Sequence, residues 1–208
     1  MSNEPAVAPA TRLTVANVAT ARQRMAVRVL ALFGWHVEFD GLPGPHGVII
    51  VYPHTSNWDF PLGLLGKWAI GCPFHWLAKE SLFTGPIGRI IGPLLRSWGG
   101  EPVARSSSTG ATQRLALRMR AAPWYWLALA PEGTRALRPR WRSGFYHLAL
   151  QAQVPLLAVS FDYATRTVAA TAVVNLCGEV EADRAAIAHA FAARVGYRPA
   201  NAAPITWT

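Results

Sequence analysis

A histidine and an aspartate five positions apart carry the residue types needed for proton transfer. His54 and Asp59 lie in the segment YPHTSNWD at 52–59, directly after a short apolar run. On one continuous helix their side chains would point about 140° apart, so they cannot share a helical face. If His54 lies on a strand-to-helix turn and Asp59 in the first helical turn, the carboxylate can fix the imidazole tautomer and leave the other ring nitrogen as a general base. The spacing therefore predicts a His–Asp pair on a turn.

Asp59 also has a purely structural explanation. The pattern Ser56-x-x-Asp59 matches a helix capping box, in which the carboxylate accepts a hydrogen bond from the backbone at the start of the helix. Residues 55–57 are all of types that cap helix N-termini. The residue types alone leave the catalytic and the capping interpretations both open.

Arg105 marks a second candidate site, at the end of the segment WGGEPVAR at 98–105. Hydroxyl residues follow at 106–109, and then a pattern typical of a helix. An arginine beside a helix N-terminus suits a phosphate group, because the first N–H groups of a helix have no partner within it. The alternative is an ordinary polar loop in which Ser108 or Thr109 caps the helix.

A third candidate, LAPEGTR at 129–135, follows a very apolar run. Ligand sites of α/β sheets commonly lie at the carboxyl ends of strands, which is where Glu132 and Arg135 are expected. Gly133 between them would let the backbone approach a ligand closely. A plain turn is the alternative. Residues 138–142 then alternate arginine with other types, a patch that suits lipid phosphates or nucleic acid, or forms a solvated rim.

Apolar runs of two lengths alternate along most of the chain, short β-rich runs with longer helical ones. This alternation indicates an α/β sheet with helices on its faces. The last two strand-like runs are joined by too few residues for a crossover helix, so they predict an antiparallel hairpin. The predicted fold is a single α/β domain with a mixed, mostly parallel sheet flanked by helices. The expected strands are 47–52, 74–78, 101–104, 124–130, 155–163 and 167–176, and the expected helices are 58–69, 86–98 with a break at Gly92-Pro93, 109–120, 143–153 and 182–195.

The N-terminal residues divide into two predicted parts. Residues 1–10 are rich in proline and alanine and are expected to form a flexible tail. Residues 11–34 are predicted to form an amphipathic helix, with Met25 and Leu32 on its apolar side and arginines on its flank. Such a helix can pack on the core or lie in a membrane interface, and both can hold at once. Glycines and prolines predict a turn-rich start to the main domain, 35–208.

Composition and charge exclude a disordered chain and locate the cationic surface. Of the 208 residues, 51% are apolar and 15% are charged, which is typical of a globular protein. The formal net charge is +9, and residues 89–142 carry ten arginines against only two glutamates. Most of the excess positive charge therefore lies in the region that holds the second and third candidate sites.

The cysteine, histidine and hydropathy patterns limit which compartment, metal site and membrane spans are expected. Cys72 and Cys177 are isolated, so no disulfide framework is expected, and the protein is expected in a reducing compartment. The six histidines lack the spacing of metal ligands, so no metal site is expected. The N-terminus lacks a secretory signal pattern. The most apolar long stretch, 60–78, is interrupted by polar residues and proline, so no transmembrane helix is expected.

Taken together, these segments resemble the glycerolipid acyltransferase family, which includes the 1-acyl-glycerol-3-phosphate (lysophospholipid) acyltransferases. The first block of that family, His-x-x-x-x-Asp, is matched by His54 and Asp59. The resemblance covers about residues 46–163, although Ala104 stands where many members carry a polar residue, which leaves the acceptor open. The Gly-to-Arg, Pro-Glu-Gly-Thr-Arg and Val-Pro blocks are matched in order by 99–105, 131–135 and 154–157.

The resemblance implies transfer of a fatty acyl group from acyl-CoA or acyl carrier protein to a lysophospholipid hydroxyl, with no cofactor. It implies that His54 is the base and Asp59 its orienting partner. No covalent acyl-enzyme is expected, because the chain lacks a Gly-x-Ser-x-Gly nucleophile pattern. The residues implied in binding the acceptor are Arg105, Glu132, Gly133, Thr134 and Arg135.

The expected partner is a membrane surface and not a nucleic acid, since no recognisable nucleic-acid-binding motif is present. The resemblance implies a peripheral protein on the cytoplasmic side of the membrane. Two alternatives stay open from the residues. One keeps the base and changes the acceptor to a lyso-aminolipid or another lipid alcohol. The other is a basic membrane- or nucleic-acid-binding module without catalysis.

Overall fold

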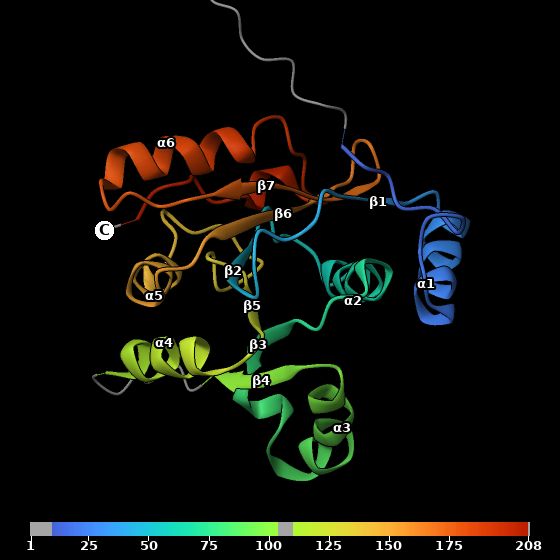
Figure 1. The fold of residues 1–208 in the computed structure, drawn as a ribbon, viewed down its shortest axis with the longest axis horizontal. Coiled ribbons are helices and arrows are strands. Elements are labelled where there is room, and N and C mark those ends of the chain that lie inside the picture. The colour runs from blue at the N-terminus through green and yellow to red at the C-terminus, as the bar shows by residue number, and fades with distance from the viewer. Residues whose placement is uncertain (1–9, 104–109, 208) are drawn as a thin grey trace, which may run out of the picture.

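A seven-stranded sheet forms the centre of the protein in a computed structural model that describes residues 10–103 and 110–207. The strand order is β1-β7-β6-β2-β5-β3-β4 (Figure 1). Within the described ranges every neighbouring pair is parallel except β6 and β7, which are antiparallel. The strands are β1 His36–Phe39, β2 His46–Val51, β3 His75–Lys79, β4 Gly100–Val103, β5 Tyr125–Leu129, β6 Leu156–Asp162 and β7 Thr167–Val174.

Helices cover the sheet on both faces (Figure 1). Helices α1 and α2 pack against each other, as do α4 and α5, and α6 packs on β7. None of the helices in the described ranges has the length and apolarity needed to cross a bilayer. The helices are α1 Ala21–Leu32, α2 Asp59–Ile70, α3 Gly85–Ser97, α4 Ala111–Ala121, α5 Gly144–Ala152 and α6 Val180–Ala190, with short 3-10 turns η1 Glu80–Leu82 and η2 Pro199–Asn201.

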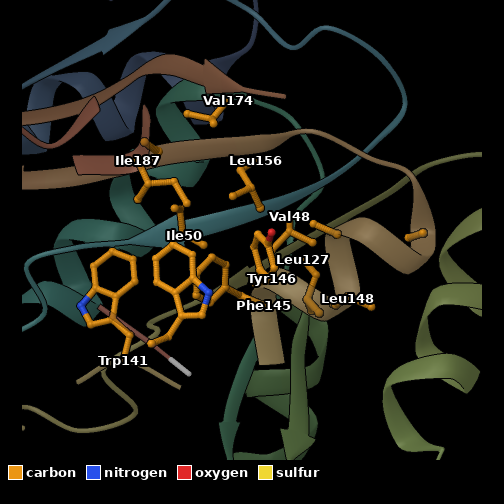
Figure 2. Packing of buried hydrophobic residues seen from close by; sticks show 14 of the residues in the cluster. Val48, Ile50, Leu127, Trp141, Phe145, Tyr146, Leu148, Leu156, Val174 and Ile187 are labelled. Carbon is orange, nitrogen blue, oxygen red and sulfur yellow. The ribbon is translucent and has the colours of Figure 1, made fainter. Parts of the chain in front are cut away.

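Strand β2 is apolar throughout its centre because both of its faces are buried. Val48 and Ile50 point into the larger core cluster together with Trp141 and Phe145 (Figure 2). Ile49, between them, points to the opposite face and packs in a second cluster. A strand that is buried on both sides must be nearly all apolar, so polar groups are confined to its ends. The chemistry of β2 is therefore expected at its carboxyl end.

The predicted single α/β domain with a mixed, mostly parallel sheet is confirmed. The predicted hairpin is also present, since β6 and β7 pair antiparallel with one irregularity between Ala158 and Ser160. Only the residues 163–166 join the two strands, which is too short for a crossover connection.

The N-terminal helix is shorter than predicted, because α1 begins at Ala21 and not at residue 11. Thr20 ends the irregular segment with a capping box: its hydroxyl accepts a hydrogen bond from the Gln23 backbone, and the Gln23 side chain accepts one from the Thr20 backbone. Residues 11–13 lie along β1 and hydrogen-bond to its backbone. The first nine residues of the predicted tail lie outside the described residues.

Two other local predictions were wrong. The turn-rich segment at the start of the main domain contains β1, a strand of four residues at the edge of the sheet. Helix α3 runs unbroken through Gly92 and Pro93. Pro93 forgoes one intrahelical hydrogen bond, but it lies on the exposed side of the helix, where water can replace that bond.

Candidate active site

The parallel strands β2, β5 and β6 end at the same edge of the sheet, and each is followed by a polar residue of the candidate site. His54 follows β2, Glu132 follows β5, and Tyr163 follows β6 directly. Helix α2 begins at Asp59, so the segment between β2 and α2 forms the predicted strand-to-helix turn. The fold thus gathers residues that lie far apart in the sequence.

His54 and Asp59 meet in this turn. The imidazole Nδ1 lies 3.0 Å from the carboxylate Oδ2, with the two side chains 20% and 1% exposed. The ring nitrogen is within hydrogen-bonding distance of the carboxylate but is not aligned with it for a hydrogen bond in this conformation. Because Nδ1 is itself buried, the exposed part of the side chain is the remainder of the imidazole. The predicted contact between the two side chains is present.

The Asp59 carboxylate has two further partners. Oδ2 accepts a hydrogen bond of 2.9 Å from the Ser56 backbone N–H, and Oδ1 accepts one of 2.7 Å from the Tyr163 hydroxyl. The Ser56 contact is the one that the capping-box pattern predicts for the carboxylate, but α2 begins at Asp59, and its N-cap residue Trp58 has no side-chain cap hydrogen bond. The Ser56 hydroxyl accepts from the backbone N–H of Trp58 at 3.1 Å. One carboxylate therefore stabilises the start of α2 and contacts the imidazole at the same time.

Tyr163 is a site residue that the sequence analysis missed. Burial, and after it the hydrogen bond to Asp59, raises the pKa of its hydroxyl above the ordinary value of 10.0. The hydroxyl therefore stays protonated and donates to the carboxylate. Its ring packs edge-on against Trp35 and Tyr197, which holds it in place. The signal that could have found it is its position directly after β6, at the edge where β2 ends.

Glu132 is buried and contacts backbone groups. Oε2 accepts a hydrogen bond of 2.7 Å from the His54 backbone N–H, and Oε1 accepts one of 2.9 Å from the Ala203 backbone N–H. Burial raises the pKa of this carboxyl, while the two backbone donors and His54 act in the opposite direction. The carboxylate thus anchors the turn that carries the imidazole to a segment near the C-terminus.

The residues after Glu132 form a tight turn. Gly133 has a φ of +66°, and a Cβ placed there would lie 2.8 Å from the Arg142 Nε, so Arg142 packs across the glycine. The Thr134 hydroxyl accepts a hydrogen bond of 3.4 Å from the Ala136 backbone. Glycine is required here both by the backbone conformation and by the neighbouring arginine.

Arg135 brings a cation to the same turn as His54. Its Nε donates a 3.0 Å hydrogen bond to the Ser56 carbonyl, and its own carbonyl accepts one from Asn201. The side chain is exposed, and within the described ranges its terminal nitrogens have no hydrogen-bond partner. A guanidinium in this position can bind a phosphate or a carboxylate. The other predicted arginine, Arg105, lies outside the described residues.

The C-terminal segment closes the back of the site. The Arg198 backbone N–H donates to the Thr55 hydroxyl at 3.1 Å, and a Cβ on Gly196 would lie 2.8 Å from that oxygen. The Tyr52 hydroxyl donates to the Ala203 carbonyl at 2.9 Å. This segment supports the turn between β2 and α2 from behind, and no motif in the sequence had indicated this role.

The arrangement can perform acid–base chemistry next to a cation. An imidazole oriented by a buried carboxylate can remove a proton from a hydroxyl group, and the carboxylate stabilises the imidazolium that forms. An exposed arginine beside it can hold an anionic group of the same substrate.

Comparison with known proteins agrees with these features. A family model described as Acyltransferase matches residues 36–162, which is more than half of the chain. The crystal structure of the 1-acyl-sn-glycerophosphate (LPA) acyltransferase PlsC from Thermotoga maritima is similar in fold, with a TM-score of 0.50 and 19% sequence identity over 79% of this chain and 73% of that one. No curated protein sequence matches significantly. Because the family model covers more than half of the chain, the chain belongs to the Acyltransferase family, and the solved structure shares its fold.

Proposed function

We propose that the protein moves a fatty acyl group from an acyl thioester, acyl-CoA or acyl carrier protein, to the hydroxyl of a lysophospholipid. Membership of the acyltransferase family supports acyl transfer. The observation that carries the proposal is the 3.0 Å contact between His54 Nδ1 and the buried carboxylate of Asp59. A lipid hydroxyl is a weak nucleophile and needs a base, and an imidazole paired with a carboxylate supplies one.

The proposed reaction is a direct transfer. The free ring nitrogen of His54 takes the proton as the acceptor oxygen attacks the thioester carbonyl. The tetrahedral intermediate then collapses, the carbon–sulfur bond breaks, and the imidazolium returns the proton to the departing thiolate. Asp59 orients the imidazole and stabilises its charged form. The thioester is already activated, so the reaction requires positioning and proton transfer.

Cationic groups near His54 support the proposal that the acceptor carries a phosphate. Arg135 lies beside the turn that carries the base, and Arg142 packs across Gly133 in the neighbouring turn. We propose that Arg135, together with Arg105, binds the acceptor phosphate. Gly133 and Thr134 shape this binding turn, and Glu132 contributes by holding the His54 backbone in place.

A membrane surface is the proposed setting of the reaction, because the acceptor and the transferred chain are both lipidic. Trp58, next to Asp59, is 65% exposed, and tryptophan favours the membrane–water interface. Leu32 and Phe33 at the end of α1 are also largely exposed. We propose a peripheral enzyme on the cytoplasmic side, where acyl-CoA and acyl carrier protein occur.

The test is mass spectrometry of lipids after the purified protein is incubated with a lysolipid panel and either acyl donor. The His54→Ala variant should lose transfer, because it removes the proposed base and leaves only the buried carboxylate of Asp59 in the turn. His189→Ala is the matched control, since His189 is an exposed histidine on α6. Full transfer by a folded His54→Ala protein would refute the proposal. Acylation of a lyso-aminolipid in place of the lysophospholipids would agree with His54 as the base and would show that the acceptor belongs to another class.

A further inference from the structure

Helix α3 carries two of its large apolar side chains, Ile90 and Leu94, on the outside, while Leu95 is buried. Ile90 is 79% exposed and Leu94 is 48% exposed, one helical turn apart. Leu82, in the short turn η1 that precedes the helix, is 40% exposed. A helix on the surface of a soluble protein normally shows the opposite arrangement, with its apolar stripe turned to the core.

The inner side of α3 explains why these side chains face outward. Gly88 and Gly92 are buried, and a Cβ on Gly88 would lie 2.5 Å from the backbone carbon of Phe83. A Cβ on Gly92 would lie 3.4 Å from the Phe83 Cα. Gly88 therefore packs directly on the chain at Phe83, where no larger residue would fit, and Leu95 fills the inner side further along the helix.

Positive charge borders the exposed apolar residues. Arg89 and Arg96 are exposed, and α3 contains no acidic residue. Lys79, at the end of β3, is exposed as well, and Glu80 is the only acidic residue of the adjoining turn η1. The α3 surface, defined as Lys79, Leu82, Arg89, Ile90, Leu94 and Arg96, therefore combines three exposed apolar side chains with three cations, of which Arg96 also lies over the ring of Phe83.

The α3 surface begins at the same edge of the sheet as the candidate site. Strand β3 runs parallel to β5, so its carboxyl end, from which η1 and α3 follow, lies at the edge where β2 and β5 end. Figure 1 shows α3 at one extremity of the molecule. The ring of Phe60, next to Asp59, contacts the ring of Trp76 on β3, with centroids 5.1 Å apart. A partner that covers α3 would therefore approach the edge that holds His54.

We propose that the α3 surface seats the protein on the anionic leaflet of a bilayer, with Leu82, Ile90 and Leu94 inserted and the cations on lipid phosphates. This inference rests on the proposed function, since it names the surface through which the enzyme meets its lipid acceptor. Apolar side chains flanked by lysine and arginine match the boundary between headgroups and acyl chains. A second copy of the chain is a poorer match, because like charges would face each other across the contact.

The experiment is sedimentation of the full-length protein with vesicles of phosphatidylcholine containing roughly one-third phosphatidylglycerol, without an acyl donor. The Ile90→Ser/Leu94→Ser variant should bind these vesicles at least roughly tenfold more weakly. Arg89→Gln should weaken binding roughly fivefold on the anionic vesicles and leave the weaker binding to pure phosphatidylcholine unchanged. All three substituted side chains are exposed, so circular dichroism and thermal unfolding should match the wild type.

Leu117→Ser is the matched control, because Leu117 is a leucine on α4 that is 60% exposed and lies among arginines. It should bind vesicles as the wild type does. A second control, Leu32→Ser/Phe33→Ser, tests α1. Loss of binding in that variant with full binding in Ile90→Ser/Leu94→Ser would overturn the inference. A wild-type dimer in sedimentation velocity that dissociates in Ile90→Ser/Leu94→Ser would also overturn it, in favour of a self-contact.

Acyl transfer to a short-chain lysophospholipid below its micellar concentration separates this inference from the proposed function. The Ile90→Ser/Leu94→Ser variant should keep wild-type transfer to this monomeric acceptor while losing transfer to acceptors in vesicles. Vesicle binding through α3 by a protein that transfers no acyl group would refute the function and support the surface. Transfer to the monomer, combined with equal vesicle binding by the variant, would refute the surface and support the function.

Discussion

Three groups converge on the carboxylate of Asp59: the Ser56 backbone, the Tyr163 hydroxyl and the His54 ring. The first two contacts would exist in a purely structural capping residue. The third contact, with the His54 ring, is the one that proton transfer requires. A substitution that keeps the capping contacts and removes only the charge therefore separates the two roles.

Asp59→Asn is that substitution. The amide oxygen can still accept from the Ser56 backbone, and the Tyr163 hydroxyl can turn to accept from the amide NH2, so the free energy of unfolding should change by less than about 1 kcal/mol. Acyl transfer should fall at least roughly a hundredfold, because a neutral amide neither stabilises the imidazolium nor fixes the tautomer. Chemical denaturation and steady-state assays on the same preparation measure both effects.

The control for this prediction is Asp40→Asn. Asp40 is exposed and accepts a hydrogen bond from the Thr11 backbone, so it resembles a capping aspartate away from the site. It should keep full activity. A large loss of stability in Asp59→Asn with activity retained per folded molecule would assign Asp59 to capping alone.

Tyr163→Phe tests the second partner of the carboxylate. Burial and the contact with Asp59 raise the pKa of the Tyr163 hydroxyl, so it donates throughout the pH range in which the enzyme can be assayed. Its removal should lower kcat about tenfold by loosening Asp59, in line with the loss of one hydrogen bond to a charged group. KM should change little, and the shape of the pH–rate profile should be that of the wild type.

Tyr197→Phe is the matched control, because Tyr197 packs against Tyr163 and is half exposed. Its activity should equal that of the wild type. Disappearance of an alkaline limb of the pH profile in Tyr163→Phe would contradict a positioning role, since it would make the hydroxyl itself a titrating participant.

The residue-scale features differ in how far the sequence could predict them. The contact between His54 and Asp59 was predictable because both residues lie within one turn of chain. Tyr163 was not, because 104 positions separate it from Asp59 and only the pairing of β6 beside β2 brings them together. The sequence also suggested that Glu132 faces a ligand, whereas its oxygens accept from two backbone groups.

At the scale of elements, the turn after β5 depends on a glycine. Gly133 has a positive φ, and Arg142 occupies the space that a side chain would need. Gly133→Ala should lower the free energy of unfolding by about 1–2 kcal/mol, from the backbone conformation alone. It should also raise the acceptor KM several-fold, because the displaced arginine and the distorted turn carry Arg135 away from the base.

Gly41→Ala separates the two effects of that substitution. Gly41 also has a positive φ, and nothing lies within 4 Å of a Cβ placed there. It should lose a similar free energy of unfolding, measured by denaturant titration, and keep the wild-type KM. Equal KM values in both variants would show that the turn after β5 takes no part in acceptor binding.

The elements that were predictable are those with a strong local pattern. Strand β2 and the hairpin of β6 and β7 follow from apolar runs and from a short connection. Strand β1 was missed because four residues at a sheet edge carry little periodicity, and it exists through pairing with β7. The start of α1 was misplaced because residues 11–13 bond to β1, a contact that is not encoded locally.

At the scale of the whole molecule, Glu132 joins two distant parts of the chain. One oxygen holds the turn that carries His54, and the other holds Ala203 near the C-terminus. Residues beyond Tyr163 match no block of the family, so no sequence pattern indicated that they belong to the site. The structure makes them part of it, through Arg198 and Ala203.

Glu132→Gln should break the link between these two parts. The amide has one accepting oxygen where the carboxylate has two, so either the His54 or the Ala203 backbone N–H loses its partner, at about 1–3 kcal/mol of unfolding free energy. Acyl transfer should fall with it. Hydrogen exchange should quicken in at least one of two segments, the turn after β2 and residues 195–207. Unchanged exchange in both segments would contradict the bridge.

The wild-type free energy of unfolding should also depend on pH in a way that the free energy of unfolding of Glu132→Gln does not. Burial raises the pKa of Glu132 above its ordinary value of 4.5, so the folded state binds the proton more tightly than the unfolded state does. That stabilisation is fully present below pH 4.5 and is lost as the pH rises through the raised pKa. Wild-type stability should therefore decline across this window by an amount that Glu132→Gln lacks, and the gap between the two proteins in urea titrations should narrow as the pH rises. A difference in stability that stays constant with pH would mean that Glu132 has the same pKa in the folded and unfolded chains. The carboxylate would then be solvated, and it would not be the buried link between the catalytic turn and the C-terminal segment.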